Sequence, residues 1–138
     1  MKNEFQIKQE NLFIENCVNN RISPMKNNRK FCVSYKQKDK AGFDNDQGYK
    51  IHISFGTLDD YYKHFFVLAN ELCRQNLTFK FVNPEIIKTT SFSPDVEGTQ
   101  SGKTFTIYLD KGDRLIFNDT IKELTSGAEK RVEGEFKL

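Results

Sequence analysis

The chain has 138 residues, with 21 basic and 19 acidic side chains and a formal net charge of +2. This length fits one domain, and so balanced a charge gives no reason to expect nucleic acid or a membrane surface as a partner. No apolar run approaches the roughly 20 residues of a membrane span, and the polar start does not resemble a targeting segment. The three cysteines lack the spacing of a zinc site and fit reduced thiols in the cytoplasm.

The first 40 residues have the least regular pattern, and we treat residues 1–40 as an N-terminal extension of the domain. A short amphipathic helix is predicted around residues 11–18, and the polar residues 21–30 read as a loop. Residues 31–35 are rich in aromatic and β-branched side chains, which favour a strand. A charged connection with Gly, Asn and Asp leads to the next strand.

Residues 49–55 alternate in character, as expected for a strand whose two faces differ. Ile51 and Ile53 point to one side, whereas three polar side chains point to the other: Lys50, His52 and Ser54. Unpartnered polar groups are costly to bury. This strand is therefore either a solvated edge or one wall of a polar site.

Thr57, with Asp60 three residues later, has the pattern of a helix N-cap. The helix predicted over residues 58–75 carries two neighbouring apolar rows that a sheet must cover. The rows are Tyr61, Phe65, Leu68 and Leu72, and Tyr62, Phe66, Ala69 and Cys73. We expect both rows to lie in the core.

Two further strands are predicted over residues 77–82 and 103–109. In the first, Phe79 and Phe81 share a face and Lys80 points away from it. In the second, Phe105, Ile107 and Leu109 form the apolar face, and Thr104, Thr106 and Tyr108 form the polar face. Residues 84–88 fit one helical turn, and residues 89–101 form a loop of a length that is usually functional or mobile.

A second helix is predicted over residues 114–125. Its expected inner face consists of Leu115, Ile116, Ile121 and Leu124. The whole order of elements predicts an α+β fold, an α/β sandwich in which helices cover the apolar face of a central sheet. The opposite, polar face carries side chains from three strands: Lys50, His52, Ser54, Lys80, Thr104, Thr106 and Tyr108.

Taken singly, these polar residues have ordinary explanations, since a lysine on an open sheet face is usually solvated. Together, two lysines and a histidine on one face would repel one another unless an anion such as phosphate lay between them. Close cations also lower the pKa of a neighbouring lysine, so that part of it is neutral and can act as a base. Histidine can donate a proton near neutral pH. These groups suit a β-elimination that expels phosphate.

Three segments in this order resemble the N-terminal lyase domain of class III lanthipeptide synthetases. They are residues 47–54 (QGYKIHIS), 79–81 (FKF) and 101–108 (SGKTFTIY). The resemblance covers residues 47–124 and extends, more distantly, to the phosphothreonine lyase effectors of bacterial type III secretion. It implies a cytoplasmic bacterial enzyme that eliminates phosphate from phosphoserine or phosphothreonine without metal or cofactor, leaving dehydroalanine or dehydrobutyrine.

The resemblance also implies roles for single residues. Lys80 would take the Cα proton, His52 would protonate the leaving phosphate, and Lys50 would hold the phosphate or the substrate carbonyl. Three further residues are assigned to substrate and phosphate binding: Lys103, Thr106 and Tyr108. Strand alternation places Lys103 on the face opposite Tyr108, unless it turns over the edge at the start of the strand.

The sequence departs from this family at several places. Tyr49 stands where relatives carry Trp, and residues 89–100 contain no phosphate-binding Arg. Towards the C-terminus, Arg114 and Arg131 are the available arginines. No kinase motif occurs, so we expect residues 1–138 to be a single lyase domain, either excised from a larger synthetase, acting alone, or a fragment that lacks part of its phosphate site.

The expected partners are a phosphorylated precursor peptide and the kinase and cyclase domains of the same synthetase, with neither nucleic acid nor membrane. A lyase that acts on a phosphorylated host kinase is the alternative within the same class. A non-catalytic phosphopeptide-binding module, and an interaction domain with a solvated basic face, are the alternatives from other classes.

Overall fold

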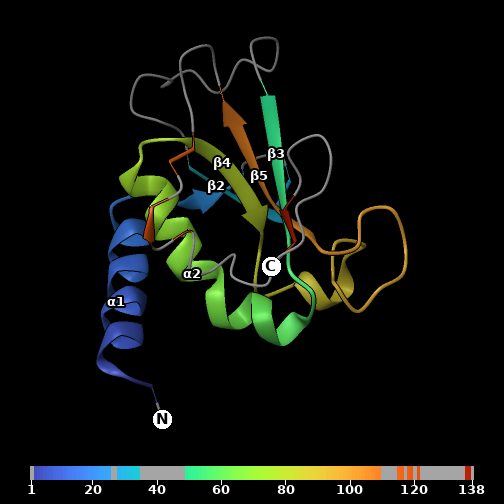
Figure 1. Cartoon of the computed structure of the whole chain (residues 1–138), viewed down its shortest axis with the longest axis horizontal. Coiled ribbons are helices and arrows are strands. Elements are labelled where there is room, and N and C mark those ends of the chain that lie inside the picture. The colour runs from blue at the N-terminus through green and yellow to red at the C-terminus, as the bar shows by residue number, and fades with distance from the viewer. Residues whose placement is uncertain are drawn as a thin grey trace.

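The structure is a computed structural model that describes residues 2–25, 28–34, 49–109, 115–116, 118–119, 121 and 136–137. Within this part of the chain, two α-helices pack against one sheet (Figure 1). The helices are α1 (Glu4–Val18) and α2 (Leu58–Arg74), and η1 (Ile87–Thr89) is a short 3-10 helix. The strands are β1 (Ser23–Pro24), β2 (Phe31–Ser34), β3 (Tyr49–Ser54), β4 (Thr78–Val82), β5 (Lys103–Leu109) and β6 (Phe136–Lys137). The predicted α+β fold is confirmed.

The strand order in the sheet is β1-β2-β4-β5-β3-β6. Strands β1 to β5 pair antiparallel with their neighbours, and β6 runs parallel to β3. Strand β5 therefore lies between β4 and β3, although β3 precedes both in the sequence. This order brings together the three strands that carry the predicted polar residues.

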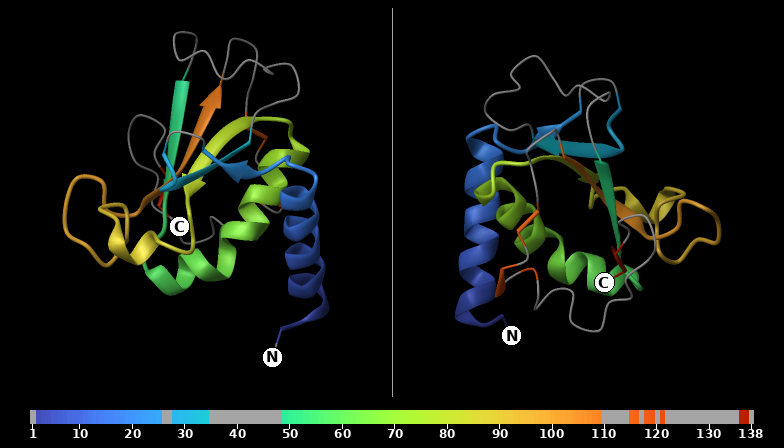
Figure 2. Two further views of the ribbon diagram at one scale, coloured as in Figure 1. Left: turned by 180° about the vertical axis from the view of Figure 1, so that it is seen from behind. Right: turned by 45° about the horizontal axis from the view of Figure 1, so that its top comes forward.

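Both helices lie on the same side of the sheet (Figure 2). The face that they cover carries a stack of aromatic rings. The ring centroids of Phe81 and Phe105 lie 5.1 Å apart. Phe13 of α1 and Phe65 of α2 reach the same Phe81 ring, at 6.2 and 6.3 Å. Phe79, Phe81 and Phe105 are completely buried, so this face holds the apolar core.

Helix α1 begins seven residues before the predicted start at residue 11, because a capping box fixes its first turn. The Asn3 side chain accepts a hydrogen bond from the Gln6 amide at 2.8 Å, and the Gln6 side chain accepts one from the Asn3 amide at 2.9 Å. The loop predicted over residues 21–30 contains strand β1, which pairs with β2. Pro24 is tolerated there because β1 is an edge strand.

Helix α2 agrees with its prediction to within one residue at its end. The Thr57 hydroxyl accepts a hydrogen bond from the Asp60 amide at 3.1 Å, which confirms the predicted cap. Tyr61 and Leu72 are fully buried, but Tyr62 is 37% exposed. The expectation that both rows lie wholly in the core is therefore wrong for Tyr62, which lies at the margin of the apolar stripe.

The helix predicted over residues 114–125 lies largely outside the described residues, as do Leu124, Arg114, Arg131 and the connection over residues 35–48. Leu115 and Ile121 are buried as expected. Ile116 is 56% exposed, contrary to its predicted place on the inner face. The Gln75 side chain holds the Ile116 backbone by two hydrogen bonds of 2.9 Å, which fix this segment with the Ile116 side chain outward.

In the described residues, no helix is both long and apolar enough to cross a lipid bilayer.

Candidate functional site

The strand register places Lys80, Thr106 and His52 in one row across the polar face. Lys80 of β4 pairs with Thr106 of β5, and Thr106 pairs with His52 of β3. Neighbouring strands lie about 4.8 Å apart, so the backbones of Lys80 and His52 are separated by about 10 Å. A lysine and an imidazole at this separation can both reach a group held above Thr106.

A second row lies two residues further along the same strands. It consists of Thr78 on β4, Tyr108 on β5 and Lys50 on β3. The Lys50 ammonium lies 5.6 Å from the centroid of the Tyr108 ring, which is within the range of a cation–π contact. The two rows therefore give the polar face two lysines, one histidine and one phenol.

The imidazole of His52 is in contact with the hydroxyl of Thr106. Thr106 Oγ1 and His52 Nδ1 are 3.2 Å apart, and Thr106 is buried. When the imidazole is protonated both of its nitrogens donate, so Thr106 accepts the Nδ1 proton while Nε2 carries the other one. This contact fixes the orientation of the ring.

Lys80 is half-buried, and its ammonium lies 4.3 Å from the centroid of the Phe31 ring of β2. Burial, and then the positive charge of Lys50, lower the pKa of Lys80 below its ordinary value of 10.5. The sequence predicted a lysine pKa lowered by a neighbouring cation, and here desolvation is the larger cause.

Lys103 and Thr104 lie at an irregularity in the pairing of β3 with β5. Ile53 pairs with Phe105 but Ser54 pairs with Lys103, so Thr104 is an extra residue on β5. A bulge of this kind redirects side chains. It aligns Lys103 with Ser54, which has the parity of His52, whereas simple alternation places Lys103 on the helix-covered face.

Not all of the polar face is open. Thr104 is 1% exposed and its hydroxyl donates to the Ile53 carbonyl at 3.3 Å. The expectation of an uncovered face is therefore wrong for Thr104 and Thr106. Both threonines lie at the centre of the sheet, where the flanking strands and their side chains enclose short side chains.

The loop over residues 90–102 closes against this part of the sheet. The Gly102 amide donates to the Phe92 carbonyl at 2.9 Å, and Gly102 has a φ of 78°. A Cβ at this position would lie 3.1 Å from the Phe55 carbonyl oxygen, so glycine is required for the close approach. Phe92 packs edge-on against Phe31, with ring centroids 5.2 Å apart.

Phe31 and Phe92 were not singled out as site residues by the sequence. Phe31 reaches Lys80 through the antiparallel pairing of β2 with β4, which joins segments almost 50 residues apart. No local pattern carries that pairing. Alternation along residues 31–34 shows that Phe31 and Val33 share a face. Only the pairing of Val33 with Lys80 shows that Lys80 lies on this same face.

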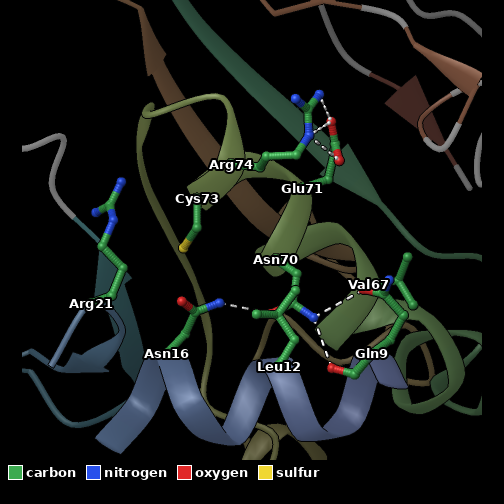
Figure 3. Close-up of a pocket in the computed structure, with 9 residues that line it drawn as sticks. All are labelled: Gln9, Leu12, Asn16, Arg21, Val67, Asn70, Glu71, Cys73 and Arg74. Atoms are coloured by element: carbon green, nitrogen blue, oxygen red, sulfur yellow. Dashed lines mark hydrogen bonds and ion pairs between the residues drawn. The ribbon is translucent and has the colours of Figure 1, made fainter. Parts of the chain in front are cut away.

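Two arginines lie at a hollow between α1 and α2 (Figure 3). The hollow has a volume of about 370 Å³ and is lined by Gln9, Leu12, Asn16, Arg21, Val67, Asn70, Glu71, Cys73 and Arg74. Asn70 donates to the Gln9 carbonyl at 2.8 Å and accepts from Asn16 at 3.0 Å, which joins the two helices. Arg74 pairs with Glu71 at 2.5 Å. Arg74 belongs to α2, whereas Arg21 follows α1 and donates to the Ser34 hydroxyl of β2. Neither arginine belongs to the two polar rows.

The described part of the chain contains no group of three or more His, Cys, Asp or Glu residues able to hold a metal ion.

Residues 23–132 match the family described as RamC, N-terminal domain. No curated protein matches the chain, and no solved structure does. The matched range contains all of β1 to β5 and α2, and therefore every residue of the two polar rows. Helix α1 lies before it. Because the match covers most of the sequence, the chain belongs to the RamC N-terminal domain family, which is related to lanthipeptide biosynthesis.

Proposed function

We propose that this protein is a phosphoserine and phosphothreonine lyase. It eliminates phosphate from a phosphorylated precursor peptide in lanthipeptide biosynthesis and leaves dehydroalanine or dehydrobutyrine. The observation that carries the proposal is the row of Lys80, Thr106 and His52, with Lys50 beside it. The lanthipeptide-related family supports the biosynthetic setting.

In the proposed reaction, neutral Lys80 Nζ takes the proton from Cα of the phosphorylated residue. The electron pair of the C–H bond forms the Cα–Cβ double bond, and the bond from Cβ to the phosphate oxygen breaks. Protonated His52 gives its proton to that oxygen, and inorganic phosphate leaves. Lys50 offsets the negative charge that develops on the substrate carbonyl or the phosphate.

The geometry supports this division of roles. A β-elimination needs a base at Cα and an acid at the oxygen on Cβ, so the two groups must approach neighbouring atoms from separate positions. Lys80 and His52 lie on either side of Thr106 in one row. The lowered pKa of Lys80 increases the fraction of neutral amine near neutral pH.

The chemistry also defines the partners. The phosphorylated residue has to be supplied by a kinase, and the dehydro residue is an electrophile that a cysteine thiol of the peptide can attack to close a thioether ring. We therefore propose that the partners of this domain are the kinase and cyclase domains of a cytoplasmic bacterial synthetase, and that its reaction follows the first and precedes the second. The reaction as written needs neither metal nor organic cofactor.

The test is mass spectrometry of a phosphoserine-containing precursor peptide incubated with the protein and with its kinase and cyclase partners. We expect loss of phosphoric acid, release of free phosphate, and a product that adds an external thiol at the former phosphoserine. A phosphopeptide recovered intact would refute the lyase. A phosphorylated kinase activation-loop peptide in the same assay distinguishes the effector-type substrate.

One observation favours a second candidate, a phosphopeptide-binding module. The contact of Lys80 with the Phe31 ring favours the protonated lysine, and a protonated lysine binds phosphate but cannot act as a base. This candidate predicts that the phosphopeptide binds saturably and is released unchanged.

A further inference from the structure

The ammonium of Lys80 is placed on the side of β4 that faces away from His52. Strand β4 lies between β2 and β5. Val33 of β2 pairs with Lys80, and Phe31 lies two residues before it on the same face. The ammonium reaches diagonally to the Phe31 ring, 4.3 Å from its centroid, whereas Thr106 and His52 lie across β5.

The Phe31 ring is a fixed surface. It is 7% exposed and belongs to the buried core. Phe92 packs against it at 74° between the ring planes, and edge-on pairs of this kind are favourable. Because the hydrogen bond between Gly102 and Phe92 anchors the loop over residues 90–102, the ring is held from the loop side as well as from β2.

The charges around Lys80 leave the ring as its favourable partner. Lys50 and His52 of β3 and Tyr108 of β5 lie on the same face of the sheet as Lys80, on the side away from Phe31. Among the described residues, Lys80 forms no ion pair with a carboxylate. The negative face of an aromatic ring attracts a cation and has no comparable attraction for a neutral amine.

We infer that the protonated Lys80 side chain rests on the Phe31 ring, a cation–π contact that we call the seat, and that Phe31 is therefore a positioning residue for the base. Protonated Lys80 lies on the ring, away from His52. Loss of the proton removes the attraction and frees the amine to turn across β4 towards Thr106. The position of the side chain thereby depends on its protonation. The role of the seat in catalysis rests on the proposed function, whereas the contact between the Lys80 ammonium and the Phe31 ring does not depend on that function.

The test replaces Phe31 by phenylalanine analogues with one, two and three ring fluorines, which weaken the negative face of the ring with little change in size. The pKa of Lys80 is followed by NMR of protein labelled with carbon-13 in lysine, with Lys80→Arg to assign the signal. A contact worth about 0.5–1 kcal/mol predicts that the pKa falls by about half a unit across the series. The same analogues at Phe55, which packs on the opposite face, should leave the Lys80 signal unchanged. An unchanged pKa for the Phe31 series would overturn the seat.

A second measurement needs no substitution and remains available if the fluorinated proteins fail to fold. Protons above an aromatic ring resonate upfield, so the ε-protons of Lys80 should be shifted upfield below its pKa and lose that shift above it. Ordinary lysine shifts at every pH would contradict the seat.

Elimination assays separate this inference from the proposed function. In single-turnover experiments, the pH at which the rate rises should move down by the same half unit in the Phe31 series. NMR shifts without any elimination would refute the lyase and leave the seat intact. Elimination with an unmoved pH profile and an unmoved pKa would refute the seat alone.

Discussion

The two faces of strand β4 differ in function: one packs in the apolar core, and the other carries a residue proposed to act in catalysis. Phe79 and Phe81 are completely buried under the helices and stack with Phe105. Lys80 between them is half-buried on the other face, where burial lowers its pKa. Alternation along one strand thus separates the residues that hold the fold from those that supply chemistry. Substitutions on the two faces should therefore have separable effects.

The largest effect is expected from removing the base. Lys80→Met should lower the rate of elimination about 1,000-fold, within the range that general bases contribute. The free energy of unfolding should not fall, because methionine fits the half-buried position without a charge to desolvate. Single-turnover elimination and urea unfolding measure the two quantities.

Phe81→Leu is the matched substitution on the other face of the same strand. It should reduce the free energy of unfolding by about 1–3 kcal/mol, since it removes part of a fully buried ring, while the protein that remains folded keeps its activity. Full activity in the Lys80→Met protein would remove Lys80 as the base. A Phe81→Leu protein that is stable but inactive would break the separation of the faces.

His52→Gln tests the acid on the polar face. Glutamine keeps a hydrogen-bonding side chain but cannot transfer the proton, so elimination should slow about 100-fold. The decline in rate at alkaline pH that comes from loss of the acidic proton should disappear from the pH profile of kcat/KM. An unchanged profile would show that another group protonates the leaving phosphate.

Thr106→Val and Thr104→Val compare the two buried threonines of β5. Thr106 holds the His52 ring at 3.2 Å, whereas Thr104 bonds to the Ile53 carbonyl. Both valine variants should lose about 1 kcal/mol of stability with the hydrogen bond. Thr106→Val should in addition slow elimination about tenfold, the change in rate that corresponds to the free energy of one hydrogen bond. Thr104→Val should leave the rate of elimination unchanged. Equal rates in the two variants would show that the Thr106 contact does not orient the imidazole.

Local patterns predicted the elements that carry their own signals. Strand β5 has the predicted bounds because Phe105, Ile107 and Leu109 alternate with threonine and tyrosine after Gly102. Helix α2 was found through its Thr57 cap and its apolar rows. The start of α1 was not predicted because its apolar residues are scattered, so that only the capping box of Asn3 and Gln6 marks where the helix begins.

Properties that depend on distant strands could not be predicted. The sequence placed Lys50, His52 and Lys80 on one polar face, but it contained no information on which strands are neighbours. The alignment of Lys80 with His52 across Thr106, the bulge that redirects Lys103, and the seat on Phe31 all follow from the pairing of non-consecutive strands. Such pairings are fixed by the assembled core rather than by any segment alone.

The smallest predicted effect is on the pH dependence of the free energy of unfolding. It comes from Lys80 on the polar face and not from the apolar residues of the other face. Because burial and Lys50 lower the pKa of Lys80 in the folded state, the unfolded chain holds this proton more tightly, with a pKa near 10.5. Below both pKa values the folded state bears the full cost of the charge. As the pH rises through the folded-state pKa towards 10.5, the unfolded state binds more protons and stability gains.

The free energy of unfolding of the unmodified protein should therefore rise with pH relative to that of Lys80→Met, from neutral pH up to 10.5. Urea unfolding at several pH values gives this difference directly. Lys63→Met, at an exposed position on α2, is the control for loss of a lysine elsewhere. A difference between the unmodified protein and Lys80→Met that stays constant with pH would mean that Lys80 ionises as it does in the unfolded chain. The polar face would then lack the partly neutral lysine that elimination requires.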